Sequence, residues 1–416
     1  MNQLAPVPQE KRNLGGGDLF LLWAGAAVSL AEIWAGGTLA PLGLTAGLAA
    51  IILGHLIGNT PLALGGLIGY QEGLPSMVIT RSALGLRGSY LAAGLNIIQL
   101  VGWTAIMLWL GGQAAAALAK PFGEHSLTWW IIIGGVGTTL WALIGHRYWR
   151  WLHRIAVSAL LLMCLHMSWL VWQRLGEGIE AASAPGGLGF GVGLDLVIAM
   201  PISWLPLVAD YSRFGRSGRG SAWGTWWGYF IVSSWMYVLG LGAALATGSA
   251  TPEAMIMELL AKSGWLAAAL GIVILSTFTT TFLDVYSAAV SSLNLPVNPG
   301  QKGTTILAGG LGTIIALVFS EPFYEPFLLY IGSFFCPLFG LVLADYFIIR
   351  QGRLVTEKLL SGASPYNIQG LIAWAVGFGV YRLALSMDWP TGASLPSFIV
   401  AGLIYIFIKG RNRTKG

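Results

Sequence analysis

The chain has 416 residues, of which 56% are hydrophobic and only 9% are charged, and its mean hydropathy is +0.72. Soluble globular proteins carry about 25% charged residues, so this composition excludes an ordinary soluble fold. Apolar stretches recur along the whole length, each near the ~20 residues that span a hydrocarbon core. The sequence therefore predicts an all-α polytopic membrane protein, since a transmembrane β-barrel would show short alternating segments instead.

Twelve transmembrane helices are predicted, with ends uncertain by several residues. They lie at about 19–44, 47–70, 90–118, 128–146, 151–173, 192–213, 222–247, 264–293, 304–320, 326–349, 367–387 and 394–409. The first span is too long for a cleaved signal peptide and follows a polar N-terminus. Connections are short, so the chain reads as one transmembrane domain, residues 1–416.

A break at "GEGIEAASAPGG" (176–187) divides the first ten spans into two halves of five. The predicted organisation is an N-terminal tail (1–18), a first five-helix repeat (19–175), a second five-helix repeat (188–350) and two additional helices (367–409).

The distribution of lysine and arginine predicts the orientation of the chain. If the N-terminus is cytoplasmic, 18 of the 22 basic residues fall on the cytoplasmic side, only Lys120, Arg174 and Lys262 fall outside, and Arg382 lies within a span. We therefore expect both termini to be cytoplasmic and the protein to lie in the inner (cytoplasmic) cell membrane. The net charge of +5 follows from this topology, and nothing beyond it favours a nucleic-acid partner.

Cysteine and histidine give little sign of chemistry. Cys164 and Cys336 lie in apolar spans and are interpreted as small buried residues, although a disulfide between them stays possible. His55 and His166 also lie inside spans, where a hydrogen bond to a neighbouring helix is the expected role. No metal-ligand cluster and no nucleophile–base pair is present, so neither a cofactor nor an enzyme is predicted.

Two spans are expected to be interrupted. The first contains "WAGAAVSLAEIWAGG", with small residues around the single acid Glu32, and the sixth contains "AMPISWLPLVADYSRF", with Pro201 and Pro206. Proline removes a backbone donor and clashes with the preceding turn. Corresponding broken segments in two halves indicate a binding site near the membrane midplane of a transporter, although Gly and Pro are also common in membrane helices.

The eighth span, "ILSTFTTTFLDVYSAAVSS", gathers hydroxyls and one carboxylate. Thr277, Thr281 and Asp284 share one helical stripe, with Ser276 and Thr280 beside it. Such hydroxyls often bond back to the preceding turn. Together with carbonyls freed by a broken helix, they can also supply the oxygen ligands that a hard cation needs, so a cation site is predicted.

Polar and aromatic groups reach a similar depth in other spans. Ser29 and Glu32 share a stripe with Gly25 and Val28 in the first span, and Gln99 and Trp103 share a face of the third with Asn96. The sixth span contributes Ser203 and Trp204. Glu32 could bind a donor group of a substrate, carry a proton or pair with a buried partner. A flat polar solute stacked between two Trp rings would suit this arrangement, although packing is the default role of Trp.

The stretches "LAEIWAGGTLAPLG", "NIIQLVGWTAIM", "SWLPLVADYSRFGR", "LSTFTTTFLDVYSA" and "YIGSFFCPLFGLVLADYF" resemble the nucleobase–cation symporter family, which includes cytosine permeases and hydantoin transporters. The resemblance covers essentially all of the chain and is strongest to the hydroxymethylpyrimidine permeases of thiamine precursor salvage. It implies a leucine-transporter-like fold with a five-plus-five inverted repeat, two extra helices and alternating access around a midplane site.

The resemblance also implies roles for residues. The substrate ring would lie between Trp103 and Trp204, near Gln99, although Trp204 stands closer to Asp210 than the family spacing suggests. Sodium would bind the carbonyls of Gly25, Val28 and Val273 and the hydroxyls of Ser276 and Thr277. The usual Asn of the eighth span is absent, and Thr280, Thr281 and Asp284 occupy its neighbourhood. Glu32 departs from the cytosine-permease pattern, and we expect it to accept hydrogen bonds from an aminopyrimidine.

The leading interpretation is a sodium-coupled importer of a small pyrimidine, hydroxymethylpyrimidine before cytosine or another nucleobase. Proton coupling through Glu32 or Asp284 stays open, because a buried carboxylate readily holds a proton. A channel would instead need a continuous polar pore. Asp210 and Asp345, each in an "ADY" motif, are interpreted as interfacial acids near Arg213 and Arg350, with gating as the other possibility.

Overall fold

The computed structural model describes residues 5–120, 126–144, 149–176, 187–249, 266–297, 299–361 and 364–413. Within these ranges the chain is helical, apart from connecting turns and one isolated bridge between Leu14 and Gly215. This agrees with the expectation from the apolar spans, because a helix satisfies its own backbone hydrogen bonds inside a bilayer.

The first half of the chain begins with a 3-10 turn, η1 (Gln9–Lys11). Its further helices are α1 (Gly16–Ala27), α2 (Leu30–Gly37), η2 (Ala40–Leu42), α3 (Gly43–Glu72), α4 (Ser76–Ile79), α5 (Arg81–Leu84), α6 (Gly88–Ala119), α7 (Leu127–Ile144) and α8 (Trp149–Gly176).

The second half begins at α9 and ends near the C-terminus. Its helices are α9 (Phe190–Trp204), η4 (Leu205–Leu207), α10 (Val208–Ser212), α11 (Gly218–Thr247), α13 (Leu266–Ser292), α14 (Gly300–Val318), η5 (Glu321–Phe323), α15 (Tyr324–Leu343), the π-helical η6 (Ala344–Ile349), α16 (Thr356–Ser361), α17 (Ile368–Ser386) and α18 (Ser394–Arg413).

Eight helical segments in the described ranges are long and apolar enough to cross a membrane, judged by length and composition. Two shorter apolar helices, Ser158–Gln173 and Ser394–Lys409, fall within the fifth and twelfth predicted spans. α13 covers most of the eighth predicted span, whose first residues lie outside the described ranges, as does most of the 176–187 break. The total of twelve helices and the five-plus-five repeat stay predictions.

Both spans expected to be broken are broken. Two non-helical residues, Val28 and Ser29, separate α1 from α2, and the tight turn η4 separates α9 from α10. One detail differs from the expectation, because Pro201 lies inside α9 and the helix changes only at Trp204. Of the two prolines, only Pro206 lies in the turn η4. It stands in the first turn of that short helix, where the backbone N–H has no partner within the helix, so its absence costs little stability.

Three short helices were not predicted. α4 and α5 occupy the connection between α3 and α6, and α16 lies between η6 and α17. Each has only four to six residues, which is too short to give a periodic apolar pattern in the sequence.

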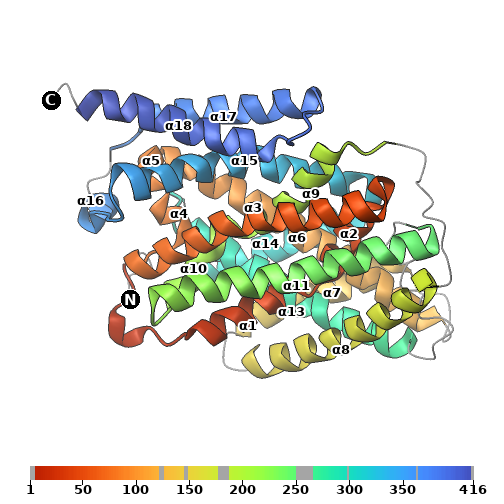
Figure 1. Ribbon diagram of the computed structural model, residues 1–416. Coiled ribbons are helices and arrows are strands. Elements are labelled where there is room, and N and C mark those ends of the chain that lie inside the picture. The colour runs from red at the N-terminus through yellow and green to blue at the C-terminus, as the bar shows by residue number, and fades with distance from the viewer. Residues whose placement is uncertain are drawn as a thin grey trace.

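The long helices run roughly side by side, as Figure 1 shows. The labels of both termini lie at the left end of that view, together with α4, α5 and α16. α17 and α18 pack on each other along one edge and contact the rest of the molecule mainly through α15, with further contacts to η6, α5 and α9. α11 packs against α1, α2 and α3, so the N-terminal helices are held by an element of the second half.

Glycine sets the distance between α2 and α11. A Cβ atom on Gly240 would overlap the carbonyl oxygen of Ile33, and a Cβ atom on Gly36 would overlap the carbonyl oxygen of Tyr237. The two backbones therefore touch where neither helix carries a side chain, as is common where membrane helices pack closely.

We predict that Gly240→Ala lowers the free energy of unfolding by about 1–3 kcal/mol, because overpacking forces the two helices apart. Gly94→Ala is the matched control, since a Cβ there meets no atom within 4 Å. Thermal unfolding of the purified protein in detergent measures both. Equal stability of the two variants would contradict the close approach of α2 and α11.

Candidate functional site

At the break in the first span, the C-terminal end of α1 lies next to the N-terminal end of α2. α1 ends at Ala27, Val28 has φ −77° and ψ 86°, and Ser29 is extended with φ −147° and ψ 157°. The Ser29 hydroxyl accepts a hydrogen bond from the backbone N–H of Glu32 at 3.3 Å, which caps the start of α2. The last carbonyls of α1 and the first N–H groups of α2 thus meet at the break, where they can bind ions or polar groups.

The side chain of Glu32 is held from α11. Tyr229 donates its hydroxyl hydrogen to Oε1 of Glu32 at 2.5 Å, and the Ser233 hydroxyl lies 2.7 Å from Oε2. Glu32 is 2% exposed, so its carboxyl group is paired inside the bundle as a buried acid requires. Of the three roles considered for Glu32, pairing with a buried partner is therefore present, and the partners are hydroxyls; binding a substrate and carrying a proton stay predictions.

His55 of α3 extends this network. Its Nε2 atom lies 2.6 Å from the Ser233 hydroxyl, and its Nδ1 atom lies 2.8 Å from the carbonyl oxygen of Ile51. The expected hydrogen bond from His55 to a neighbouring helix is thus present. Glu32, Ser233 and His55 form one hydrogen-bonded row that joins α2, α11 and α3.

Counting hydrogen-bond donors shows how many protons the row holds. To make all of its hydrogen bonds, it needs one proton more than an ionised Glu32 and a neutral His55 would carry together. A carbonyl only accepts, so Nδ1 of His55 carries a hydrogen, and Ser233 has a single hydrogen to share between its two neighbours. If Ser233 donates to Glu32, Nε2 must also be protonated; if it donates to Nε2, Oε2 of Glu32 must be protonated. Either arrangement is neutral overall, which suits an apolar bundle.

Gln99 connects α6 to the second broken span. Its amide nitrogen donates to the carbonyl oxygen of Ser203 at 2.9 Å and to the side-chain oxygen of Asn96 at 2.8 Å. Asn96 in turn donates to Ser291 of α13 at 2.8 Å. The buried Oε1 atom of Gln99 accepts no hydrogen bond from the described residues, and the Ser203 hydroxyl donates to the Met200 carbonyl at 2.6 Å.

The two tryptophans expected to flank a substrate lie on α6 and at the end of α9, and they are 7% and 8% exposed. Trp103 makes edge contacts with Tyr324 and Phe327, at centroid distances of 6.4 and 5.3 Å. Trp204 makes an edge contact with Trp23 at 5.9 Å. In the described ring contacts the two tryptophans face different neighbours. The buried indole nitrogen of Trp103 has no hydrogen-bond partner among the described residues.

Further aromatic contacts close the cluster. Trp23 also meets Tyr229 at 6.4 Å and Tyr211 at 6.1 Å. Trp34 of α2 stacks on Tyr324 at 3.9 Å, and the Tyr324 hydroxyl donates to the carbonyl oxygen of Ala31 at 2.7 Å. Rings from α1, α2, α6, α9, α11 and α15 therefore surround the break next to Glu32.

α13 supplies the remaining predicted contacts. Asp284 is buried, at 2% exposure. Tyr211, whose ring meets Trp23, is its electrostatic neighbour. The Thr281 hydroxyl bonds back to the carbonyl oxygen of Thr277 at 2.7 Å, and Thr280 is buried.

The residues expected to bind sodium lie at two places. Gly25 and Val28 stand at the end of α1 beside the break, and Val273 and Thr277 are buried in α13. The Thr277 side chain packs against Gly111 of α6. The side chain of Ser276 lies outside the described residues. The sodium site therefore stays a prediction.

The two "ADY" acids have structural partners. Asp345 forms an ion pair with Arg350 at 2.6 Å and accepts a hydrogen bond from Tyr405 at 2.8 Å, as expected of an interfacial salt bridge. Asp210 instead accepts the backbone N–H of Ser76 at 3.0 Å, while Arg213 donates to the backbone oxygen of Asp210. Both cysteines are buried and free.

Three features were not foreseen. Tyr229 and Ser233 were missed, although polar residues four apart in the apolar stretch "YFIVSSW" share a helix face. Asp195 of α9 was also missed. Its two oxygens accept the N–H groups of Ala393 at 2.6 Å and Ser394 at 2.8 Å, and it caps α18.

Comparison with known proteins places the chain in a family. Residues 6–400 match the family described as permeases for cytosine/purines, uracil, thiamine and allantoin. The chain belongs to this permease family. It is a multi-pass integral membrane protein and a secondary transporter of the nucleobase and hydantoin type, not an enzyme.

Individual relatives support the same conclusion. The cytosine permease of Escherichia coli (strain K12) is 27% identical over 316 residues, covering 74% of this chain and 71% of the relative. A putative purine-cytosine permease of Bacillus subtilis is 27% identical and covers 88% and 83%. The solved structure of Mhp1, a nucleobase-cation-symport-1 transporter in a closed conformation with bromovinylhydantoin bound, is 21% identical, with a TM-score of 0.85 over 99% and 96% of the two chains.

The row through Ser233 predicts that Ser233→Ala lowers the free energy of unfolding by about 1–3 kcal/mol, because Glu32 and His55 each lose a buried partner. Ser234→Ala is the control, since the neighbouring hydroxyl is buried and has no partner in the described structure. Thermal unfolding in detergent measures the difference. A Ser234 variant as unstable as the Ser233 variant would contradict the assigned network.

Proposed function

We propose that this permease imports a small aminopyrimidine, hydroxymethylpyrimidine in the first place, by cation symport with alternating access. The observation that carries the proposal is a pair of buried polar atoms on one face of α6. Oε1 of Gln99 is an acceptor and Nε1 of Trp103 is a donor, one helical turn apart, and neither has a partner among the described residues. A flat heterocycle with an N–H donor and a ring-nitrogen acceptor satisfies both, and unsatisfied buried groups are costly otherwise.

The aromatic cluster supports the same substrate class. In this proposal the substrate ring meets the N–H edge of Trp103 and stacks against Trp204, whereas the family resemblance implies stacking between both indoles. Ser203, Ser29, Thr280 and Thr281 border the ring. Glu32 and Asp284 accept hydrogen bonds from exocyclic groups, since each carboxylate oxygen accepts more than one. The relatives are permeases of cytosine and purines, and Mhp1 binds bromovinylhydantoin, so cytosine or another nucleobase is the alternative substrate.

Sodium is the proposed coupling ion. The break at Val28 and Ser29 frees carbonyls near Gly25, and the hydroxyls of Ser276 and Thr277 with the carbonyl of Val273 would complete a set of hard oxygen ligands. We also propose that the protein lies in the inner membrane with both termini cytoplasmic, because lysine and arginine concentrate in the connections on the side of the termini.

Proton coupling is the second candidate, and the row of Glu32, Ser233 and His55 favours it. The row must hold one shared proton to complete its hydrogen bonds. Moving that proton from Oε2 of Glu32 to Nε2 of His55 turns Glu32 from a donor into an acceptor, so binding of a substrate beside Glu32 would be linked to where the proton is held.

We predict that Trp103→Phe, which keeps a ring but removes the N–H donor, weakens hydroxymethylpyrimidine binding by about 5-fold or more, since one hydrogen bond contributes about 1 kcal/mol. Glu32→Gln is expected to weaken it about 10-fold or more, because hydrogen bonds to charged groups are stronger. Trp169→Phe is the control, since Trp169 is exposed on α8. Isothermal titration of purified protein measures all three, with cytosine in parallel.

Unchanged affinity in both the Trp103 and Glu32 variants would contradict the proposed site. Tighter binding of cytosine than of hydroxymethylpyrimidine would keep the permease function and replace the proposed substrate.

The coupling ion is tested by uptake of labelled hydroxymethylpyrimidine into proteoliposomes. We expect an inward sodium gradient to drive accumulation that choline cannot support, and Thr277→Ala to abolish it, because a sodium ligand is lost. Thr138→Ala, which removes another buried hydroxyl from α7, should leave it intact. Accumulation that ignores sodium, follows an imposed pH gradient and is lost in His55→Gln would contradict sodium coupling and support the proton.

A further inference from the structure

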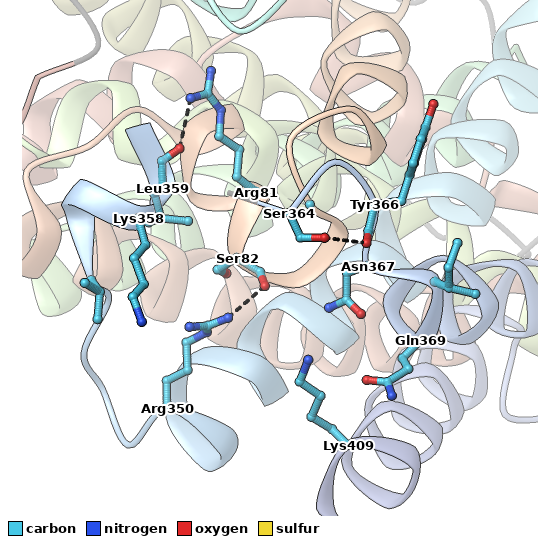
Figure 2. Close-up of a pocket in the computed structure, with 13 residues that line it drawn as sticks. Arg81, Ser82, Arg350, Lys358, Leu359, Ser364, Tyr366, Asn367, Gln369 and Lys409 are labelled. Atoms are coloured by element: carbon cyan, nitrogen blue, oxygen red, sulfur yellow. Dashed lines mark hydrogen bonds between the residues drawn. The ribbon is translucent and has the colours of Figure 1, made fainter. Parts of the chain in front are cut away.

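A cavity lined by polar and cationic side chains lies away from the aromatic cluster, at the end of the bundle where α5 and α16 are found. Its volume is about 420 Å³. Figure 2 shows its lining, which comes from α5, the end of η6, α16, the segment before α17, and α18. This cavity joins the connection between α3 and α6 to the two C-terminal helices.

Four cationic side chains line the cavity, and none of its lining residues is acidic. They are Arg81, Arg350, Lys358 and Lys409. Arg350 is already paired with Asp345 at 2.6 Å and also donates to the carbonyl oxygen of Ser82 at 2.9 Å. In the described part of the chain neither Lys358 nor Lys409 has an ion pair. The cavity therefore concentrates positive charge that the protein does not neutralise.

Arg81 is the most buried of the four cations, at 6% exposure. Its Nε atom donates to the side-chain oxygen of Asn294 at 2.7 Å and its Nη1 atom donates to the carbonyl oxygen of Leu359 at 3.2 Å. Both acceptors are neutral, and burial lowers the pKa of the guanidinium. An anion in the cavity would offset the cost of burying this charge.

A neutral donor stands beside the cations. Ser82 is buried, lines the cavity and has a hydroxyl with no partner among the described residues. Asn367 also lines the cavity, but its side-chain nitrogen already donates to the carbonyl oxygen of Ala83 and to the Tyr405 hydroxyl. In Figure 2 the end of Arg350 extends toward Ser82 and the end of Lys409 extends toward Asn367, while Lys358 lies on the other side of Arg350. Cations together with a free hydroxyl donor match the acceptor oxygens of a phosphate group.

We propose that this cavity binds a phosphate group, either of a free phosphate compound or of an anionic phospholipid headgroup. The volume exceeds that of a bare phosphate, so a glycerol-sized substituent fits as well. Basic cavities between membrane helices on the positively charged side commonly take lipid headgroups. Binding would tie α5 to α16 and α18, and it does not depend on the identity of the transported substrate.

The experiment compares two double variants of the full-length protein, each lacking two positive charges at this end of the molecule. Lys358→Gln with Lys409→Gln removes two cations from the cavity. Lys302→Gln with Arg353→Gln removes two exposed cations that do not line it. Ser82→Ala, a third variant, removes the unpaired hydroxyl without changing the charge.

Two arms separate the sources of the phosphate group. In the first, inorganic phosphate is titrated into protein in a non-ionic detergent at low salt. In the second, native mass spectrometry compares retention of phosphatidylglycerol and phosphatidylcholine by protein taken from mixed vesicles. We expect saturable binding in at least one arm, weakened about 10-fold or more in the cavity double variant and several-fold in Ser82→Ala, and unchanged in the control.

Binding in the first arm identifies a free phosphate compound, and preferential retention of phosphatidylglycerol identifies a lipid headgroup. Two outcomes overturn the proposal. One is the absence of saturable binding in both arms, and the other is an equal loss in the cavity and control double variants, which would mean that only the overall charge matters.

Discussion

A carboxyl group in the middle of an apolar bundle must be paired, and in this protein the pairing of Glu32 determines how the helices around it are arranged. Both of its oxygens are bound by hydroxyls of α11, and Ser233 passes the interaction to His55 of α3. These contacts need α11 to lie directly against α2, which the backbone contact at Gly36 and Gly240 permits. The polar row and the glycine contact therefore depend on each other.

The same constraint explains why the break in the first span can exist in a membrane. Backbone groups at a broken helix need partners because lipid offers none. Ser29 caps α2, and buried rings cover the break, among them Trp23, Trp34 and Tyr324. The second break, at η4, is joined to α6 through Gln99. Irregular backbone is thus enclosed by protein, and among the described residues Oε1 of Gln99 and Nε1 of Trp103 are left without a hydrogen-bond partner.

The sequence predicted those features that depend on residues close together in the chain. Small residues and proline indicated both breaks, and the isolated acid in "VSLAEIWAGG" indicated a functional position at Glu32. The position of Trp103 and Gln99 on one helix face followed from their spacing, and their role in substrate binding stays a prediction. Asp345 was placed beside Arg350 because acids near a membrane surface pair with nearby bases.

Features that depend on contacts between distant segments could not be predicted. Tyr229 is 197 residues from Glu32 in the chain, and only packing shows that they meet. Tertiary structure also determines three other features: the position of Pro201 inside α9, the short helices α4, α5 and α16, and the capping of α18 by Asp195. The cation ligands proposed from the resemblance, Ser276 above all, remain predictions.

We propose that the protein opens a site beside Glu32 to one side of the membrane and then to the other. Counterflow tests it most directly: proteoliposomes are preloaded with unlabelled hydroxymethylpyrimidine, and entry of the labelled compound is followed without any ion gradient. The account predicts that preloading accelerates entry, because a loaded carrier returns faster than an empty one. Entry at the same rate in preloaded and empty vesicles, with no saturation, would indicate an open pore and would contradict the account.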